Sequence, residues 1–157
     1  MTQMRIVNLT TCQSSQAPMV ILEDQQRSRW LAFYLPLNEA NRLARVLGKT
    51  PCASVPIFEL LERLCRVAEI DVLQAEIDGS AEGVSATVVF RTGQSDVSLE
   101  CHPADAMALA TRAGAPVLAS EAALAHASPV DPDVRAEVMR HWLDALSPAD
   151  FAGEVGL

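Results

Sequence analysis

The stretch DVLQAEIDGSAEGVSATVVFRTGQSDVSLECH (residues 71–102) decides the fold, because apolar and polar residues alternate along three successive segments. The first segment (71–78) ends at the turn sequence GSAEG, and the second (84–91) ends at TGQ. The third segment (95–102) again places alternate residues on an apolar side. Alternation interrupted by short turn sequences is typical of half-buried antiparallel strands. Residues 71–102 therefore predict an antiparallel meander of three strands.

A helix is expected directly after the meander. Pro103 suits the first helical position, and the alanine-rich residues that follow continue the helical pattern to about Gly114. His102 is then the N-cap residue, and Asp105 lies in the first turn. A carboxylate there stabilises the positive end of the helix by about 0.3–1 kcal/mol, which requires no catalytic role. A short strand is expected in APVLAS, residues 115–120.

The segments upstream of the meander mix strands and helices without regular alternation. Strands are expected in MRIVNLTTC, PMVILE and WLAFYL, followed by helices in NEANRLARVLG, with Asn38 as its N-cap, and in SVPIFELLERLCRVAE. A last helix is expected after Asp131. This order predicts an α+β fold, with a mixed, largely antiparallel sheet and packed helices. We expect one domain over residues 1–151 and a loose tail over 152–157.

Composition and charge narrow the class of protein. The chain has 157 residues, of which half are hydrophobic, and a formal net charge of −8. Its apolar runs are shorter than the roughly 18 residues of a membrane span, and its start lacks a signal-peptide pattern, so we expect a cytoplasmic location and no membrane. The acidic balance argues against a protein that coats nucleic acid non-specifically. It is compatible with a nuclease whose acids hold a metal.

Five short segments carry a resemblance to a known family. The run ECHPADAMALATRAGAPVLAS (residues 100–120) is accompanied, in order along the chain, by PMVILE, LAFYLPLNEA, ASVPIFELL and LSPADF. In these motifs the chain resembles the bifunctional nuclease (BFN) domain family over nearly its whole length. The resemblance implies an α+β domain that forms a homodimer and cleaves DNA and RNA.

The family motifs are only partly kept. In the hallmark Arg-Pro-Ser-Asp-Ala, His102 replaces the arginine and Ala104 replaces the serine. In a second motif the family arginine, threonine, histidine and aspartate fall at Ser54, Ile57, Phe58 and Glu59. Two functions therefore stay open. One is metal-assisted hydrolysis of phosphodiester bonds, and the other is a non-catalytic dimeric module of the same fold, used for regulation or protein contact.

The candidate catalytic residues are Asp105, His102, Glu39 and Glu59, which would serve as metal ligands or bases. Glu100 and His102 are two apart on a strand, so their side chains share a face at a spacing of about 6.5–7 Å. With Asp105 one corner later, Glu39, Glu100 and Asp105 are the candidate ligands of a divalent metal, Mg²⁺ or Mn²⁺. Glu39 and Glu59 both lie near helix starts, where a purely structural role explains an acid equally well.

The other two histidines are expected to have no part in a site. His126 lies in an alanine-rich turn, and His141 follows Arg140 in the last helix. Neither has partners at the spacing of metal ligands, so both are interpreted as surface residues.

Overall fold

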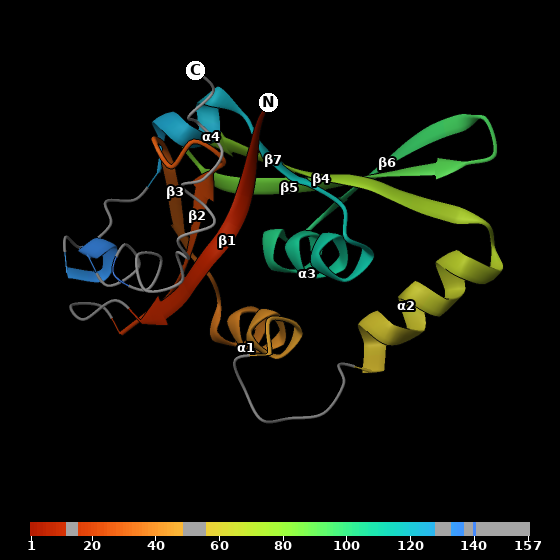
Figure 1. Ribbon diagram of the computed structural model, residues 1–157, viewed down its shortest axis with the longest axis horizontal. Helices are drawn as coiled ribbons and strands as arrows, with labels where there is room; N and C mark the ends of the chain where they lie inside the picture. Colours follow the sequence, from red (N-terminus) through yellow and green to blue (C-terminus); the bar gives the residue numbers. More distant parts are fainter. Residues whose placement is uncertain (12–15, 49–55, 128–132, 137–139, 141–157) are drawn as a thin grey trace, which may run out of the picture.

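A computed structural model describes residues 1–11, 16–48, 56–127, 133–136 and 140 of the chain. One sheet of seven strands, in the order β3-β2-β1-β7-β4-β5-β6, carries the helices (Figure 1). The strands are β1 (Thr2–Thr11), β2 (Pro18–Asp24), β3 (Trp30–Tyr34), β4 (Ile70–Ser80), β5 (Gly83–Thr92), β6 (Ser95–Cys101) and β7 (Val117–Ala119). The helices are α1 (Leu37–Val46), α2 (Pro56–Val67), α3 (Pro103–Ala113) and α4 (Glu121–Ala125).

The expected meander is confirmed as β4, β5 and β6, all antiparallel. Ala75 and Ile77 of β4 lie opposite Val88 and Ala86 of β5, and these four small or branched side chains form the buried face of the meander. A register shift between residues 72 and 74 interrupts the alternation of β4. The alternating pattern therefore sets which side of β4 and β5 faces the core. In β6, Val97 and Leu99 belong to the apolar side of the pattern but are 49% and 58% exposed.

Strand β7 joins two halves of the sheet. It has three residues, and it pairs antiparallel with β1 and parallel with β4. Strands β1–β3 form one antiparallel half, and β4–β6 form the other. Because β6 is at the far edge, the chain passes through α3 to bring β7 to the centre. The mixed, largely antiparallel sheet expected from the sequence is thus confirmed.

Helix α3 forms the centre of the core. Six of its residues are buried, and four of these are alanine: Ala104, Ala106, Met107, Ala108, Leu109 and Ala110. Such small side chains let the helix lie close to the sheet on one side and to neighbouring helices on others. Figure 1 shows α3 against the sheet, with α1 and α2 beside it. None of the helices in the described part of the chain is long and apolar enough to cross a membrane.

The start of α1 differs from the prediction. The helix begins at Leu37 after Pro36, which is its N-cap and makes no side-chain capping bond, so Asn38 lies inside the first turn. Proline holds its φ at −57°, close to a helical value, and the helix starts two residues earlier than it would with Asn38 as the N-cap. Gly48 follows the helix at φ 69°, as the sequence predicts for a helix stop. The helix expected after Asp131 begins outside the described residues.

Substitution of Gly79 by alanine is expected to destabilise the protein. A Cβ at Gly79 would lie 2.6 Å from the Cα of Ala123, so β4 and the backbone of α4 would have to separate. Overpacking of this kind costs about 1–3 kcal/mol, which urea unfolding would measure. Ser85→Ala, at an exposed position of β5, is the control and should change the unfolding free energy by less than about 0.5 kcal/mol. An unchanged midpoint for the Gly79 variant would contradict the close approach.

Acid is expected to weaken the attachment of α2 to α3. Arg112 of α3 donates hydrogen bonds of 2.7 and 3.2 Å to Glu62 of α2, and these bonds hold the pKa of Glu62 below its usual value of 4.5. The Glu62 carboxylate therefore binds a proton more readily in the unfolded chain than in the folded one. The stabilisation is present above about pH 4.5 and is lost as the pH falls through the folded-state pKa. The melting temperature of Glu62→Gln should consequently change less than that of the wild type between about pH 5 and about pH 3.

Candidate functional site

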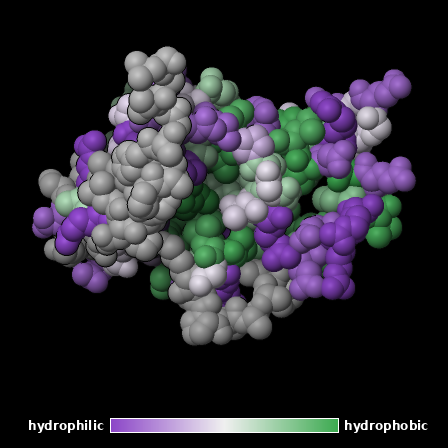
Figure 2. Space-filling model, viewed as in Figure 1, coloured by the Kyte–Doolittle hydropathy of each residue, from purple (hydrophilic) through white to green (hydrophobic). Residues whose placement is uncertain are grey.

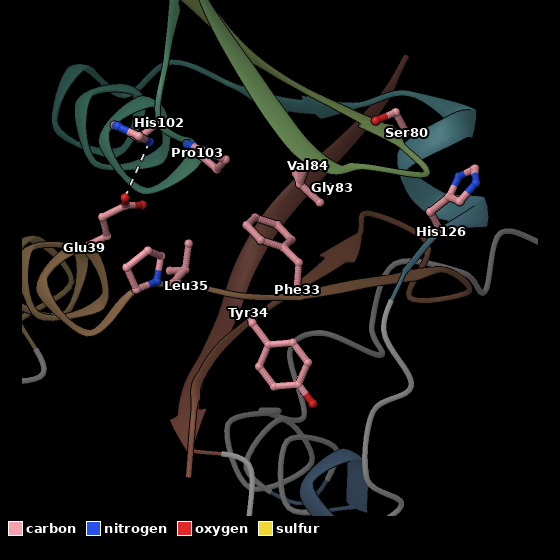
Figure 3. Close-up of a pocket in the computed structure, with 11 residues that line it drawn as sticks. Phe33, Tyr34, Leu35, Glu39, Ser80, Gly83, Val84, His102, Pro103 and His126 are labelled. Atoms are coloured by element: carbon pink, nitrogen blue, oxygen red, sulfur yellow. Dashed lines mark ion pairs between the residues drawn. The ribbon is translucent and has the colours of Figure 1, made fainter. Parts of the chain in front are cut away.

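A pocket lies where the second half of the sheet meets the start of α1. It encloses about 420 Å³, a volume within the range of about 300–1,000 Å³ common for small-ligand sites. Its walls come from β3 and the start of α1, the β4–β5 turn, the β6–α3 corner and the end of α4 (Figure 3). The lining residues are Phe33, Tyr34, Leu35, Pro36, Glu39, Ser80, Gly83, Val84, His102, Pro103 and His126.

His102 lies at the corner between β6 and α3, as the sequence predicts. It is the N-cap residue of α3, with Pro103 behind it, and its side chain makes no capping hydrogen bond. Its carbonyl instead accepts the N–H groups of Asp105 and Ala106, both at 3.0 Å. The corner is therefore held by the backbone alone, which leaves the imidazole available for other contacts.

The imidazole of His102 faces the carboxylate of Glu39. Nδ1 lies 3.5 Å from Oε1 of Glu39, and Figure 3 shows this contact at one end of the pocket. The Glu39 side chain is 8% exposed, whereas that of His102 is 72% exposed. A buried carboxylate is costly without a polar partner, and the imidazole of His102 supplies one, so the contact orients the ring. In this arrangement a buried carboxylate holds a largely exposed imidazole.

Asp105 takes part in a second contact one turn along the same helices. Arg42 lies three residues after Glu39 in α1, and its Nε and Nη2 are 3.1 and 3.2 Å from the two Asp105 oxygens. This two-point contact joins α1 to the first turn of α3. Asp105 is therefore engaged in a structural ion pair, and it supports the position of His102 rather than lining the pocket.

The remaining two predicted residues lie elsewhere. Glu59 is in α2, where it pairs with Arg63 one turn later in the same helix. Glu100 of β6 lies opposite Thr87, whereas its neighbours Leu99 and Cys101 lie opposite the buried Val88 and Ala86. Glu100 therefore projects from the other face of the sheet. The structure thus brings together Glu39, His102 and, one turn away, Asp105, but not Glu59 or Glu100.

The positions of Glu39, Glu100 and Asp105 test the prediction that they bind a divalent metal together. Among the residues that the structure describes, no three histidine, cysteine, aspartate or glutamate side chains gather closely enough to bind one ion. Glu39 faces His102, Asp105 faces Arg42, and Glu100 is on the other side of the sheet. The donor set Glu39, Glu100 and Asp105 does not fit a shared divalent cation in this arrangement, so no chemical step is assigned to one.

His126 is exposed, as interpreted from the sequence, and it also lines the pocket, which the sequence did not predict. It follows α4, and its Nδ1 lies 2.8 Å from the carbonyl oxygen of Ala122. That contact assigns the proton to Nδ1 in the neutral ring and leaves Nε2 as the acceptor. Figure 3 shows His126 at the opposite end of the pocket from His102. No local signal marks it, because α4 reaches the pocket only through the packing of α4 on β4.

The part of the chain that forms this pocket matches a known protein family. The model of one protein family, described as the bifunctional nuclease domain, matches residues 20–131, a range that contains every residue of the pocket. The chain belongs to the bifunctional nuclease domain family. This BFN chain is also 25% identical to two uncharacterized proteins of Mycobacterium tuberculosis, MT1877 of strain CDC 1551 and Rv1829 of strain H37Rv. Each match covers 96% of this chain and 98% of the relative.

Membership of the BFN family allows His102 to be compared with the residue that the family motif has at the same position. His102 occupies the position at which the resemblance places an arginine, and in this chain that position lies beside the buried Glu39. An arginine there would always be charged and could only donate hydrogen bonds. A neutral histidine has a ring nitrogen that can accept a proton. The substitution therefore replaces a fixed cation with a side chain that has an acceptor nitrogen.

Proposed function

We propose that this BFN protein hydrolyses phosphodiester bonds of DNA or RNA in the pocket between α1, α3 and the β4–β5 turn. The main support for this proposal is the contact between His102 and the buried Glu39 at the pocket wall. Both residues lie inside the region that the family model matches. Membership of a family named for nuclease activity supports the reaction class. The pair of His102 and Glu39 supplies the acid–base groups that hydrolysis of a phosphodiester bond requires.

In the proposed reaction His102 acts as the general base. Since Nδ1 faces Glu39, Nε2 is the ring atom that accepts a proton from water, and Glu39 stabilises the imidazolium that forms. The hydroxyl oxygen bonds to phosphorus, and the bond from phosphorus to the leaving oxygen breaks. The leaving oxygen takes up a proton in turn, either from the imidazolium that has formed at His102 or from solvent.

A non-catalytic module of the same fold is the second candidate. Ala104 favours it, because this residue stands at the serine of the family hallmark and is 1% exposed. A methyl group buried in the core donates no hydrogen bond to a phosphate. The two candidates differ in whether His102 and Glu39 alone sustain hydrolysis.

The deciding experiment measures cleavage of labelled single-stranded and duplex DNA and RNA by the purified protein. Reactions contain Mg²⁺, Mn²⁺ or a chelator, so that the predicted dependence on a divalent metal is measured directly. Glu39→Gln keeps the shape of the side chain and removes its charge, and it should lower cleavage at least about tenfold. Asp96→Asn, at the far end of β6, is the matched control. Equal cleavage by wild type and Glu39→Gln would reject the proposed site.

A further inference from the structure

The pocket beside His102 has an apolar middle and polar ends. Phe33, Leu35 and Val84 contribute apolar side chains to its wall, and Figure 3 shows Phe33 between the imidazoles of His102 and His126. Side chains of this kind can pack against the flat ring of a nucleobase. Its volume of about 420 Å³ is that of a site for one small molecule. The pocket therefore has room for one ring with a phosphate attached.

The described wall of this pocket lacks the cations that hold long nucleic acids. Its acidic side chain is Glu39, and none of its described residues is lysine or arginine. Arg42, three residues after Glu39, is already bonded at two points to Asp105. The phosphates of a long strand are held chiefly by lysine and arginine side chains. The described wall can therefore accept one phosphate beside His102, but it has no row of cations for the phosphates that follow.

Elsewhere on the described surface the arginines are largely neutralised. Eight of them form ion pairs with aspartate or glutamate side chains. In Figure 2 hydrophilic side chains gather over α2 and over the turn between β5 and β6, and both places contain such pairs, Arg63 with Glu59 and Arg91 with Asp96. The chain also carries a net charge of −8, so its field repels a long polyanion. These paired arginines do not form the basic groove in which a long strand lies.

Given the proposed function, on which this inference rests, we propose that the pocket binds one terminal nucleotide unit. The chain then acts on dinucleotide-sized phosphodiesters and on strand ends rather than inside long strands. The base lies against Phe33, Leu35 and Val84, and the phosphate to be attacked lies beside His102. Water adds across the bond between phosphorus and the leaving oxygen, so one product carries a terminal phosphate and the other a hydroxyl.

The first test measures binding, so its result does not depend on cleavage. Nuclease-resistant phosphorothioate thymidylates of two to about sixteen nucleotides are titrated onto the protein at about 50 and about 200 mM salt. Binding of one terminal unit predicts dissociation constants that change less than about threefold with length and less than about tenfold with salt. A protein with about 6–10 phosphate contacts would instead gain affinity with length and lose about 10³–10⁵ of it over this salt range.

A closed single-stranded circle separates the effect of an end from that of length. The circle contains the same phosphodiester units but has no terminal nucleotide, so it should not displace a fluorescent dinucleotide from the pocket. The linear form of the same strand should displace it. In the cleavage assay the linear strand should release mononucleotides, and the circle should stay intact.

The variant Val84→Trp tests whether the pocket is the place of binding. Its indole fills the middle of the cavity from β5 and should weaken binding of the dinucleotide probe at least about tenfold. Ser85→Trp is the matched control, because Ser85 is the exposed neighbour on the same strand and projects from the other face. It should bind the probe as the wild type does. Circular dichroism checks that both variants are folded.

Four outcomes would overturn this inference. The dinucleotide probe does not bind, or affinity rises steadily with length and falls steeply with salt. The closed circle displaces the probe, or Val84→Trp binds the probe as well as the wild type does. A protein that binds as expected but cleaves none of the substrates would instead reject the proposed function, and the assignment of a terminal nucleotide to the pocket would stand.

Discussion

Replacement of His102 by alanine is expected to lower kcat/KM for phosphodiester cleavage by about 10²–10⁴, the usual contribution of a general base. The fold should persist, because the backbone at this corner is held through the His102 carbonyl and by Pro103, neither of which the substitution alters. The imidazole is largely exposed, so few packing contacts are lost. Initial rates on a short labelled oligonucleotide, measured over a range of pH, would check the effect.

Chemical rescue gives this experiment its control. Added imidazole should restore part of the activity of His102→Ala, since the vacated position is open to solvent and lies beside Glu39. Glu39→Gln should not respond to imidazole, because its own imidazole remains in place. A His102→Ala variant that cleaves as fast as the wild type would show that the histidine has no part in the reaction.

The second large effect is expected at Leu43, in the middle of α1. Its side chain is fully buried among the core residues under α1. Leu43→Ala removes this packing and leaves a cavity, which costs about 2–5 kcal/mol in comparable sites. Since α1 carries both Glu39 and Arg42, the loss should loosen the helix that positions the acid of the pocket. Denaturant unfolding measures the free energy.

Leu37→Ala is the matched control for this experiment. It makes the same chemical change in the same helix, but at a side chain that is 65% exposed. Its effect should be within about 0.5 kcal/mol. If the two variants lose equal stability, helix propensity rather than core packing would explain the result, and the assignment of Leu43 to the core would fail.

Local patterns predicted much of the fold. Alternation over residues 71–102 was enough to predict β4, β5 and β6, because the side-chain period of a strand is visible in a single segment. Pro103 marked the start of α3 for a similarly local reason. Strand β7 was expected as a strand, but its position between β1 and β4 depends on pairing across more than a hundred residues, which no local pattern contains.

The site was predicted only in part. His102 and Glu39 were both named as candidates, yet their contact arises from the packing of α1 against α3, which brings together residues 63 positions apart. Glu59 and Glu100 looked equivalent to Glu39 in the sequence, since all three are acids near the ends of elements. What separates them is burial: Glu39 is enclosed at the pocket, whereas Glu100 is exposed and Glu59 pairs within its own helix.

The three-residue strand β7 has a consequence for when the protein can act. Glu39 lies in α1, which follows the first half of the sheet along the chain, and His102 lies at the start of α3, which follows the second half. Strand β7 pairs with both halves and joins them edge to edge. A nascent chain that has not yet delivered residues 117–119 from the ribosome lacks this seam. The pairing that joins the two halves edge to edge is then incomplete, so we expect the sheet to reach its final form only after synthesis has passed this point.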